Sequence, residues 1–153
     1  MTLTTAATET GIAITWLDGV LRADTGAGGI VPLASGGIHE EIDVSGRVYP
    51  KVIYRYQGGS DYAAVGAKRR VYVNALYAVY AVWEIASYNG VLDALAGRID
   101  GLLSGQAAAV DGGLMLACVR VDPLRIPGLF NGVPIRMLGG VYRIYSQLTS
   151  QAS

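Results

Sequence analysis

The residue types on which most enzymes depend are scarce in this chain of 153 residues, which has one histidine, one cysteine and two lysines. Cys118 has no partner for an internal disulfide and lies in the apolar run at residues 114–119, so we expect a buried, inert thiol. His39 is followed by acidic residues, but consecutive positions splay apart and other metal ligands are missing. This pattern indicates a solvated loop.

Two motifs of enzymes are incomplete. Ser60 follows two glycines but lacks the later glycine that completes a nucleophile elbow. The glycines at positions 26, 28 and 29 resemble part of a phosphate-binding loop, but no Lys-Ser or Lys-Thr pair follows them. Together with the scarcity of histidine and cysteine, these gaps predict a protein without catalytic residues, metal or cofactor.

Charge is also scarce, and it is balanced. Twelve basic and twelve acidic residues cancel, which gives no long-range attraction to nucleic acid or anionic lipid. Charged residues make up 16% of the chain, against roughly a quarter in an average protein, so part of the surface should be apolar and should contact a protein partner. Ten of the basic residues are arginine, which interfaces favour, although a GC-rich genome would produce the same bias.

No targeting or membrane segment is predicted. Residues 1–10 are rich in Thr and Ala, lack Lys and Arg, and have no hydrophobic core, so they do not resemble a signal peptide. No stretch approaches the ~20 apolar residues of a membrane span. We expect one domain over residues 1–153, with residues 1–10 flexible, that works in the cytoplasm where it is made.

The first half of the chain predicts a helix and a hairpin. After Thr10 as cap, apolar residues share one helical face, namely Ile12, Trp16, Leu17, Val20 and Leu21. A loop rich in Gly and Pro follows at residues 24–37. Strands are expected at residues 52–56 and 69–77, joined by a glycine-rich loop at 57–68.

The second half predicts a long helix and two more strands. Seven residues spaced alternately four and three apart form one helical stripe: Ala81, Ile85, Tyr88, Leu92, Leu95, Ile99 and Leu102. This indicates a helix from about residue 78 to 103, with a kink or a division into two helices at Asn89-Gly90. Strands follow at 114–121 and 133–146, separated by a turn at Asp122-Pro123. Gly139-Gly140 indicates a bulge or a close backbone approach.

This order of elements predicts an α+β fold: an antiparallel or mixed sheet of about four strands with two helices packed on one face. The layout resembles the tail terminator and tail completion proteins of long-tailed bacteriophages, which close the head-proximal end of the tail tube. The segments that carry the resemblance are the Pro-opened aromatic strand at 49–56, the strand at 69–77, the helix at 78–103 and the aromatic strand end at 139–146. The loop at 25–41 and the Asn89-Gly90 interruption depart from the family pattern.

The resemblance implies a wedge-shaped subunit of a homohexameric ring, assembled in the host cytoplasm and belonging to the virion. Such a ring docks on the last ring of tail tube protein, ends tube polymerisation and presents a new face to the head-side connector. DNA passes through the lumen without specific binding. The alternatives are a neighbouring neck component, such as a stopper or adaptor, a small ligand-binding domain walled by the Tyr-rich sheet and the helix, and an enzyme.

The glycine-rich loop at 57–68 is the predicted docking site on the adjoining ring. A turn of two to five residues would suffice to join its strands, so its extra length favours a contact role. Tyr62 is expected to be the anchor, with Val65 as a second apolar group and Asp61, Lys68 and Arg69 pairing at the rim. The basic cluster at 68–70 otherwise reads as a solvated hairpin end, with weak contact to a nucleic-acid backbone as a second interpretation.

Overall fold

Six strands form one sheet in the order β1-β2-β3-β6-β5-β4. The computed structural model describes residues 9–40, 48–63, 70–85, 90–110, 113–130 and 132–148. The strands are β1 (Ile38–Glu40), β2 (Lys51–Ala63), β3 (Arg70–Glu84), β4 (Ala108–Val110), β5 (Gly113–Phe130) and β6 (Val133–Leu148). Of the pairs between described strands, β1 with β2 is parallel and the others are antiparallel, so the sheet is mixed.

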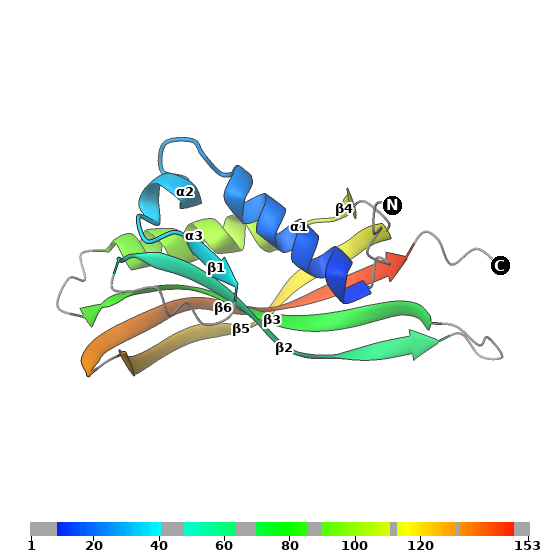
Figure 1. Cartoon of the computed structure of the whole chain (residues 1–153). Coiled ribbons are helices and arrows are strands. Elements are labelled where there is room, and N and C mark those ends of the chain that lie inside the picture. The colour runs from blue at the N-terminus through cyan, green and yellow to red at the C-terminus, as the bar shows by residue number, and fades with distance from the viewer. Residues whose placement is uncertain are drawn as a thin grey trace, which may run out of the picture.

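Three helices lie over one face of this sheet: α1 (Glu9–Ala23), α2 (Ile30–Leu33) and α3 (Val91–Leu103) (Figure 1). The expected α+β class with helices on one face therefore agrees with the structure. The sheet has six strands instead of the expected four. The two that the sequence did not predict, β1 and β4, have three residues each and are too short to show a period-two pattern. The short α2 also interrupts the loop predicted at 24–37, and Ile30 within it is fully buried. None of the described helices combines the length and hydropathy needed to cross a membrane.

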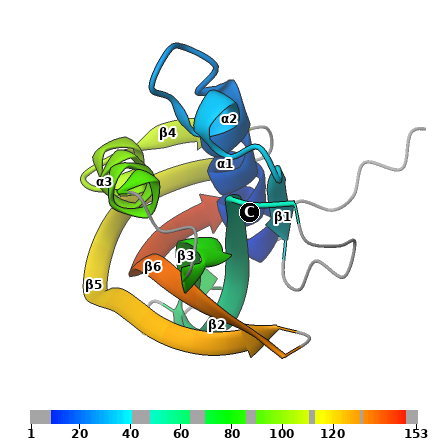
Figure 2. The ribbon, with the colours of Figure 1, turned by 90° about the vertical axis from the view of Figure 1, so that its left-hand side faces the viewer.

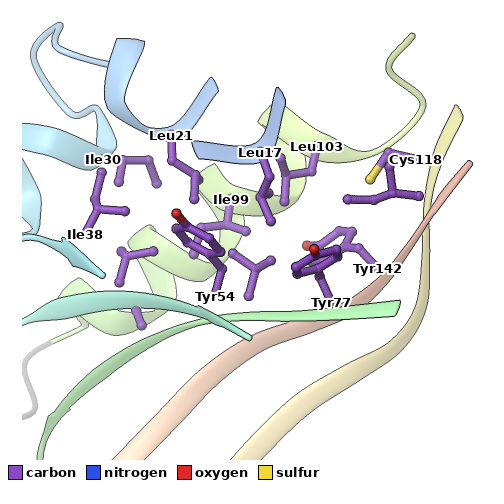
Figure 3. Close-up of a cluster of buried hydrophobic side chains, with 14 of the residues drawn as sticks. Leu17, Leu21, Ile30, Ile38, Tyr54, Tyr77, Ile99, Leu103, Cys118 and Tyr142 are labelled. Atoms are coloured by element: carbon purple, nitrogen blue, oxygen red, sulfur yellow. The ribbon is translucent and has the colours of Figure 1, made fainter. Parts of the chain in front are cut away.

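The core lies between the helices and the sheet. Figure 3 shows Leu17 and Leu21 of α1 and Ile99 of α3 directed towards the aromatic residues of the strands. Tyr77 and Tyr142 fill the space below the helices and are 1% and 0% exposed. The predicted burial of Leu95 and Ile99 is confirmed, since both are 0% exposed; the other fully buried residues of α3 are Leu92 and Leu103.

The long helix predicted at residues 78–103 is wrong in its first half. Strand β3 continues to Glu84, and α3 begins at Val91 after Gly90, whose φ of 88° permits the left-handed cap. The strand is buried on both faces at this point: Ala81 belongs to the core below the helices and Tyr80 to a cluster on the other face. Burial on both faces removes the apolar–polar alternation of a strand, so the helical spacing arose by coincidence. Tyr88 and Asn89 lie outside the described residues.

The loop predicted at 57–68 is wrong over residues 57–63, which extend β2 and pair with β3. The register shifts between Tyr56 and Gly58, so Gln57 is the extra residue of a β-bulge, and Gly58 has a φ of 133°. Gly59 lies so close to the backbone of β3 that a Cβ there would overlap the Asn74 carbonyl oxygen. The two glycines therefore serve a bend within the strand.

The turn predicted at Asp122-Pro123 is also wrong, because β5 runs unbroken to Phe130. Its register shifts between Arg120 and Asp122, which is a second bulge. Among the described strands, only β6 pairs with β5 beyond Met115, so the outer edge tolerates a proline that lacks an N–H. At Gly139 the close-approach alternative holds: an added Cβ would lie 2.6 Å from Cα of Tyr80 in β3.

Candidate protein-interaction surface

Two of the five residues predicted as a docking site, Asp61 and Tyr62, lie in the part of the β2–β3 hairpin that the structure describes. Asp61 and Tyr62 are in strand β2, where their register partners in β3 are Val73 and Tyr72. Val65, Lys68 and Arg69 lie outside the described residues. The part of the predicted site that the structure describes is thus a strand end and not a glycine-rich loop.

The surroundings of His39 and Cys118, the two residues with reactive side chains, indicate structural roles. His39 is not in a solvated loop: it lies in β1 opposite Ile53, and its Nε2 is 2.7 Å from the Gly36 carbonyl oxygen. Cys118 is fully buried, as expected, and burial together with the Asp100 carboxylate raises the pKa of its thiol to about 12. Within the described ranges, no cluster of three or more His, Cys, Asp or Glu residues could hold a metal ion.

Among the described ion pairs, the one with the most buried carboxylate joins the helices. Arg98 of α3 donates to both carboxylate oxygens of Asp24, at 2.8 and 2.6 Å, and the Ile30 backbone N–H donates to the same carboxylate at 2.8 Å. The Arg98 hydrogen bonds are the main cause of a pKa of Asp24 below its ordinary value. This arrangement fixes the segment between α1 and α2 against α3, which is a structural role.

A second set of polar contacts centres on Asp100 of α3. Its carboxylate accepts hydrogen bonds from the Ser104 hydroxyl at 2.7 Å and the Tyr142 hydroxyl at 3.1 Å, and Arg120 Nε is 3.7 Å away. Burial and this carboxylate raise the pKa of Tyr142, so the phenol remains a donor. The contacts join α3 to β5 and β6.

A pocket of about 240 Å³ lies beside α1 and α2, lined by Arg22, Val31, Ala34, Gly37 and Ile38. Ligand pockets usually enclose roughly 300–1,000 Å³ and combine apolar walls with a few convergent polar groups. This pocket is below that range, and Arg22 is the single charged residue in its lining. The Arg22 guanidinium already donates to Asp18 and to the Ile38 carbonyl. The pocket therefore gives little support to a ligand-binding function.

The side of the sheet away from the helices carries no described layer (Figure 1). Alternation along the strands, with the register of each pair, assigns residues to this side, which we call the open face. Its described members other than glycine are Lys51, Ile53, Arg55, Asn74, Leu76, Ala78, Tyr80, Val82, Glu84, Leu114, Ala117, Val119, Asp122, Leu124, Ile126, Val133, Ile135, Met137, Val141, Arg143, Tyr145 and Gln147. Most of them are apolar, whereas an antiparallel sheet with one wet face normally carries polar residues there.

The two ends of the open face differ in exposure. Ala78, Tyr80, Val82 and Ile135 form a buried cluster with Leu124 and Met137 packed against it. The sheet is strongly curled, and β5 sweeps from beside α3 to the side away from the helices (Figure 2). The curl lets neighbouring strands cover this cluster, but Leu114, Val119 and Ile126 of β5 remain 38%, 49% and 48% exposed.

Strand β5 is the main source of exposed apolar surface among the described residues. Besides its open-face residues, it exposes Leu116 and Val121 beside the two bulges and Leu129 at the hairpin end, the last being 74% exposed. Arg143 lies opposite Val119 in the neighbouring strand, and its Nε is buried without a hydrogen-bond acceptor among the described residues. A buried unpaired donor costs roughly 1–3 kcal/mol, and more when it is charged.

Comparison with known proteins gives a fold relationship. The structure is similar to a chain from the virion of a native gene transfer agent particle, with a TM-score of 0.67 and 12% sequence identity. The similarity covers 91% of this chain and 97% of that chain, so the whole domain is shared and not one motif. No protein-family model and no curated protein matches the sequence.

Proposed function

We propose that this chain is a structural virion protein that forms a homohexameric ring at the head-proximal end of a phage-like tail. The ring ends polymerisation of the tail tube protein and provides the surface that joins the head-side connector. DNA passes through its lumen without specific binding. In this role the protein belongs to the virion, acts by binding other proteins and performs no catalysis.

The observation that carries the proposal is the full-length fold similarity to a virion chain. Two domains of unrelated function can share a fold, so the surface has to support the same conclusion. It does so through an open sheet face that is mostly apolar and a net charge of zero, which fit a partner protein better than nucleic acid or lipid. The sequence layout of tail terminators supports the position at the end of the tube.

The second candidate is a neighbouring neck component, such as a stopper or adaptor. It has the same support from fold and composition and differs in the partners that it contacts. Electron microscopy of particles assembled without this chain separates the two. A terminator is expected to leave over-long tubes without heads, whereas a neck adaptor leaves tails of normal length that fail to join heads. Tails of normal length joined to heads would contradict both.

We also propose that the end of the β2–β3 hairpin contacts the adjoining tube or neck ring. Tyr62 is the anchor, Val65 adds apolar area, and Asp61, Lys68 and Arg69 pair at the rim. Support comes from the sequence, because a hairpin end with an aromatic and both signs of charge suits a docking contact. The strand register, which places Ala63 opposite Arg70, allows residues 64–69 to be replaced by a two-residue Asn-Gly turn.

Tyr62→Ala tests this docking site. It should leave the melting temperature of the isolated protein nearly unchanged and weaken binding to assembled tail tubes by ~1–3 kcal/mol, the range of an aromatic hot spot. Tyr56→Ala is a matched control from the same strand, since Tyr56 is 45% exposed but packs on Tyr77 with ring centroids 5.6 Å apart. Equal binding by wild type, Tyr62→Ala and the shortened hairpin would show that the docking site lies elsewhere.

A further inference from the structure

The part of the open face along β5 has no covering layer among the described residues. Helices cover the other face of the sheet, and open-face residues of β5 such as Val119 and Ile126 are about half exposed. Scattered exposed apolar residues are ordinary, but a continuous apolar sheet face marks a contact with another protein. We propose that the open face is the surface on which the next copy of this chain packs, an inference that rests on the ring proposed above.

The extent of the face bears on the contact that it could make. Strands β5 and β6 contain 18 and 16 residues. At about 3.3 Å per residue and about 4.8 Å between strands, a face four strands wide and about 50 Å long spans on the order of 900 Å² of sheet. This chain itself covers the part around Ala78, Tyr80 and Val82, so the neighbour would contact the remainder, along β5.

The chemistry of the face favours a second copy over a different protein. Permanent contacts between identical subunits are the most apolar class of protein interface, whereas contacts between proteins that fold and meet separately are more polar. The face also runs along the length of the molecule, between the two hairpin ends (Figure 1). A flank of this kind is suited to a lateral neighbour, which leaves the hairpin ends for the tube and the connector.

In a ring, the open face must meet a different surface of the next copy, because a contact of the face with itself would stop at a dimer.

The test measures assembly of the full-length protein by light scattering and sedimentation over a range of concentrations. The variant Val119→Asp/Ile126→Asp places two carboxylates in the exposed part of the open face. Val31→Asp is the matched control, since Val31 is 40% exposed but lies on α2, above the opposite face. Circular dichroism verifies that each variant is folded.

Wild type and Val31→Asp should form rings, and the double variant should need a concentration at least about 100-fold higher, since one hot-spot residue is worth roughly 30-fold. A double variant that still forms rings overturns the inference and leaves the proposed function intact. If the double variant forms normal rings but no longer binds the tail tube, the open face contacts the tube protein, and this result also overturns the inference. A wild-type protein that stops at a monomer or dimer refutes the ring itself.

Discussion

Replacing Gly139 with alanine tests the packing at the centre of the sheet. Gly139 of β6 pairs with Tyr80 of β3, and an added Cβ would lie 2.6 Å from the Tyr80 Cα and closer still to the Val79 carbonyl oxygen. Both are backbone atoms, so no side-chain rotation relieves the overlap. Because β3 also pairs with β2 and β6 with β5, the two strands cannot separate without disturbing both outer pairs.

We expect Gly139→Ala to lower the free energy of unfolding by about 1–3 kcal/mol, the usual effect of overpacking a dense interior. At about 2–4 °C per kcal/mol for a domain of this size, the melting temperature should fall by roughly 2–12 °C. Thermal and urea unfolding measure the change. All samples should have the same low protein concentration, because self-assembly would raise the apparent stability.

The matched control makes the same chemical change at Gly97, on the exposed side of α3, where an added Cβ would meet no atom within 4 Å. Alanine there should stabilise the protein by about 0.5–1 kcal/mol, because it favours the helix and reduces the freedom of the unfolded chain. The two variants should therefore shift the melting temperature in opposite directions. A neutral or stabilising Gly139→Ala would refute the close approach of β3 and β6.

Three further predictions concern the core and the titrating groups. Leu95→Ala and Ile99→Ala should each cost about 2–5 kcal/mol in urea unfolding, because both side chains are fully buried, and a loss below ~0.5 kcal/mol for both would contradict the helix packing. The Cys118 thiol has a pKa raised to about 12 from an ordinary 9.0, so the free energy of unfolding should fall as pH rises above 9, where the thiol ionises in the unfolded chain but not in the folded one. Cys118→Ala should remove this contribution to the pH dependence and should leave tail assembly intact. The pKa of Asp24 is lowered from its ordinary 3.8, so its contribution to stability is present above pH 3.8 and is lost as pH falls through the folded-state pKa. Asp24→Asn, which cannot titrate, should therefore lose less stability than wild type as the pH falls. Identical acid unfolding curves for the two proteins would refute this role.

Elements with one buried face were predictable from the sequence. The spacing of Ile12, Leu17 and Leu21 gave α1 because a helix on a sheet buries one stripe. The same reasoning gave the second half of α3, where Leu95 and Ile99 are buried. The central parts of the four long strands were also found, since their β-branched and aromatic residues are typical of strands.

The predicted ends of strands were wrong where the local preference of the residues conflicts with the tertiary structure. Gly58 and Gly59 predict a loop but form a bulge within β2, and Pro123 predicts a turn but lies on the outer side of β5. In each case a neighbouring strand supplies hydrogen bonds that the local sequence does not reveal. The predicted docking residues depended on the loop, so their location changed with it: Tyr62 is in a strand paired with Tyr72.

The open face was predictable only as an expectation of some apolar contact, drawn from the low charge of the chain. Its location needed the sheet order, because β3 and β6 are distant in sequence and become neighbours only in the fold. The sequence held one local indication of an apolar face. Leu114, Met115 and Leu116 are consecutive apolar residues, whereas a strand with one solvated face alternates apolar and polar residues.

Residues 78–84 show how burial on both faces of a strand hides it in the sequence. A strand loses its alternating pattern when both of its faces are buried, and such strands normally lie in sheets that have a layer on each side. In this protein the described helices form one layer only, yet Val79 and Ala81 face that layer while Tyr80 and Val82 are buried on the other side. The curl of the sheet buries these two, but it does not reach Val119 or Ile126. The curl therefore accounts for the lost alternation at residues 78–84, and the exposed apolar residues of β5 remain for the neighbouring copy proposed above.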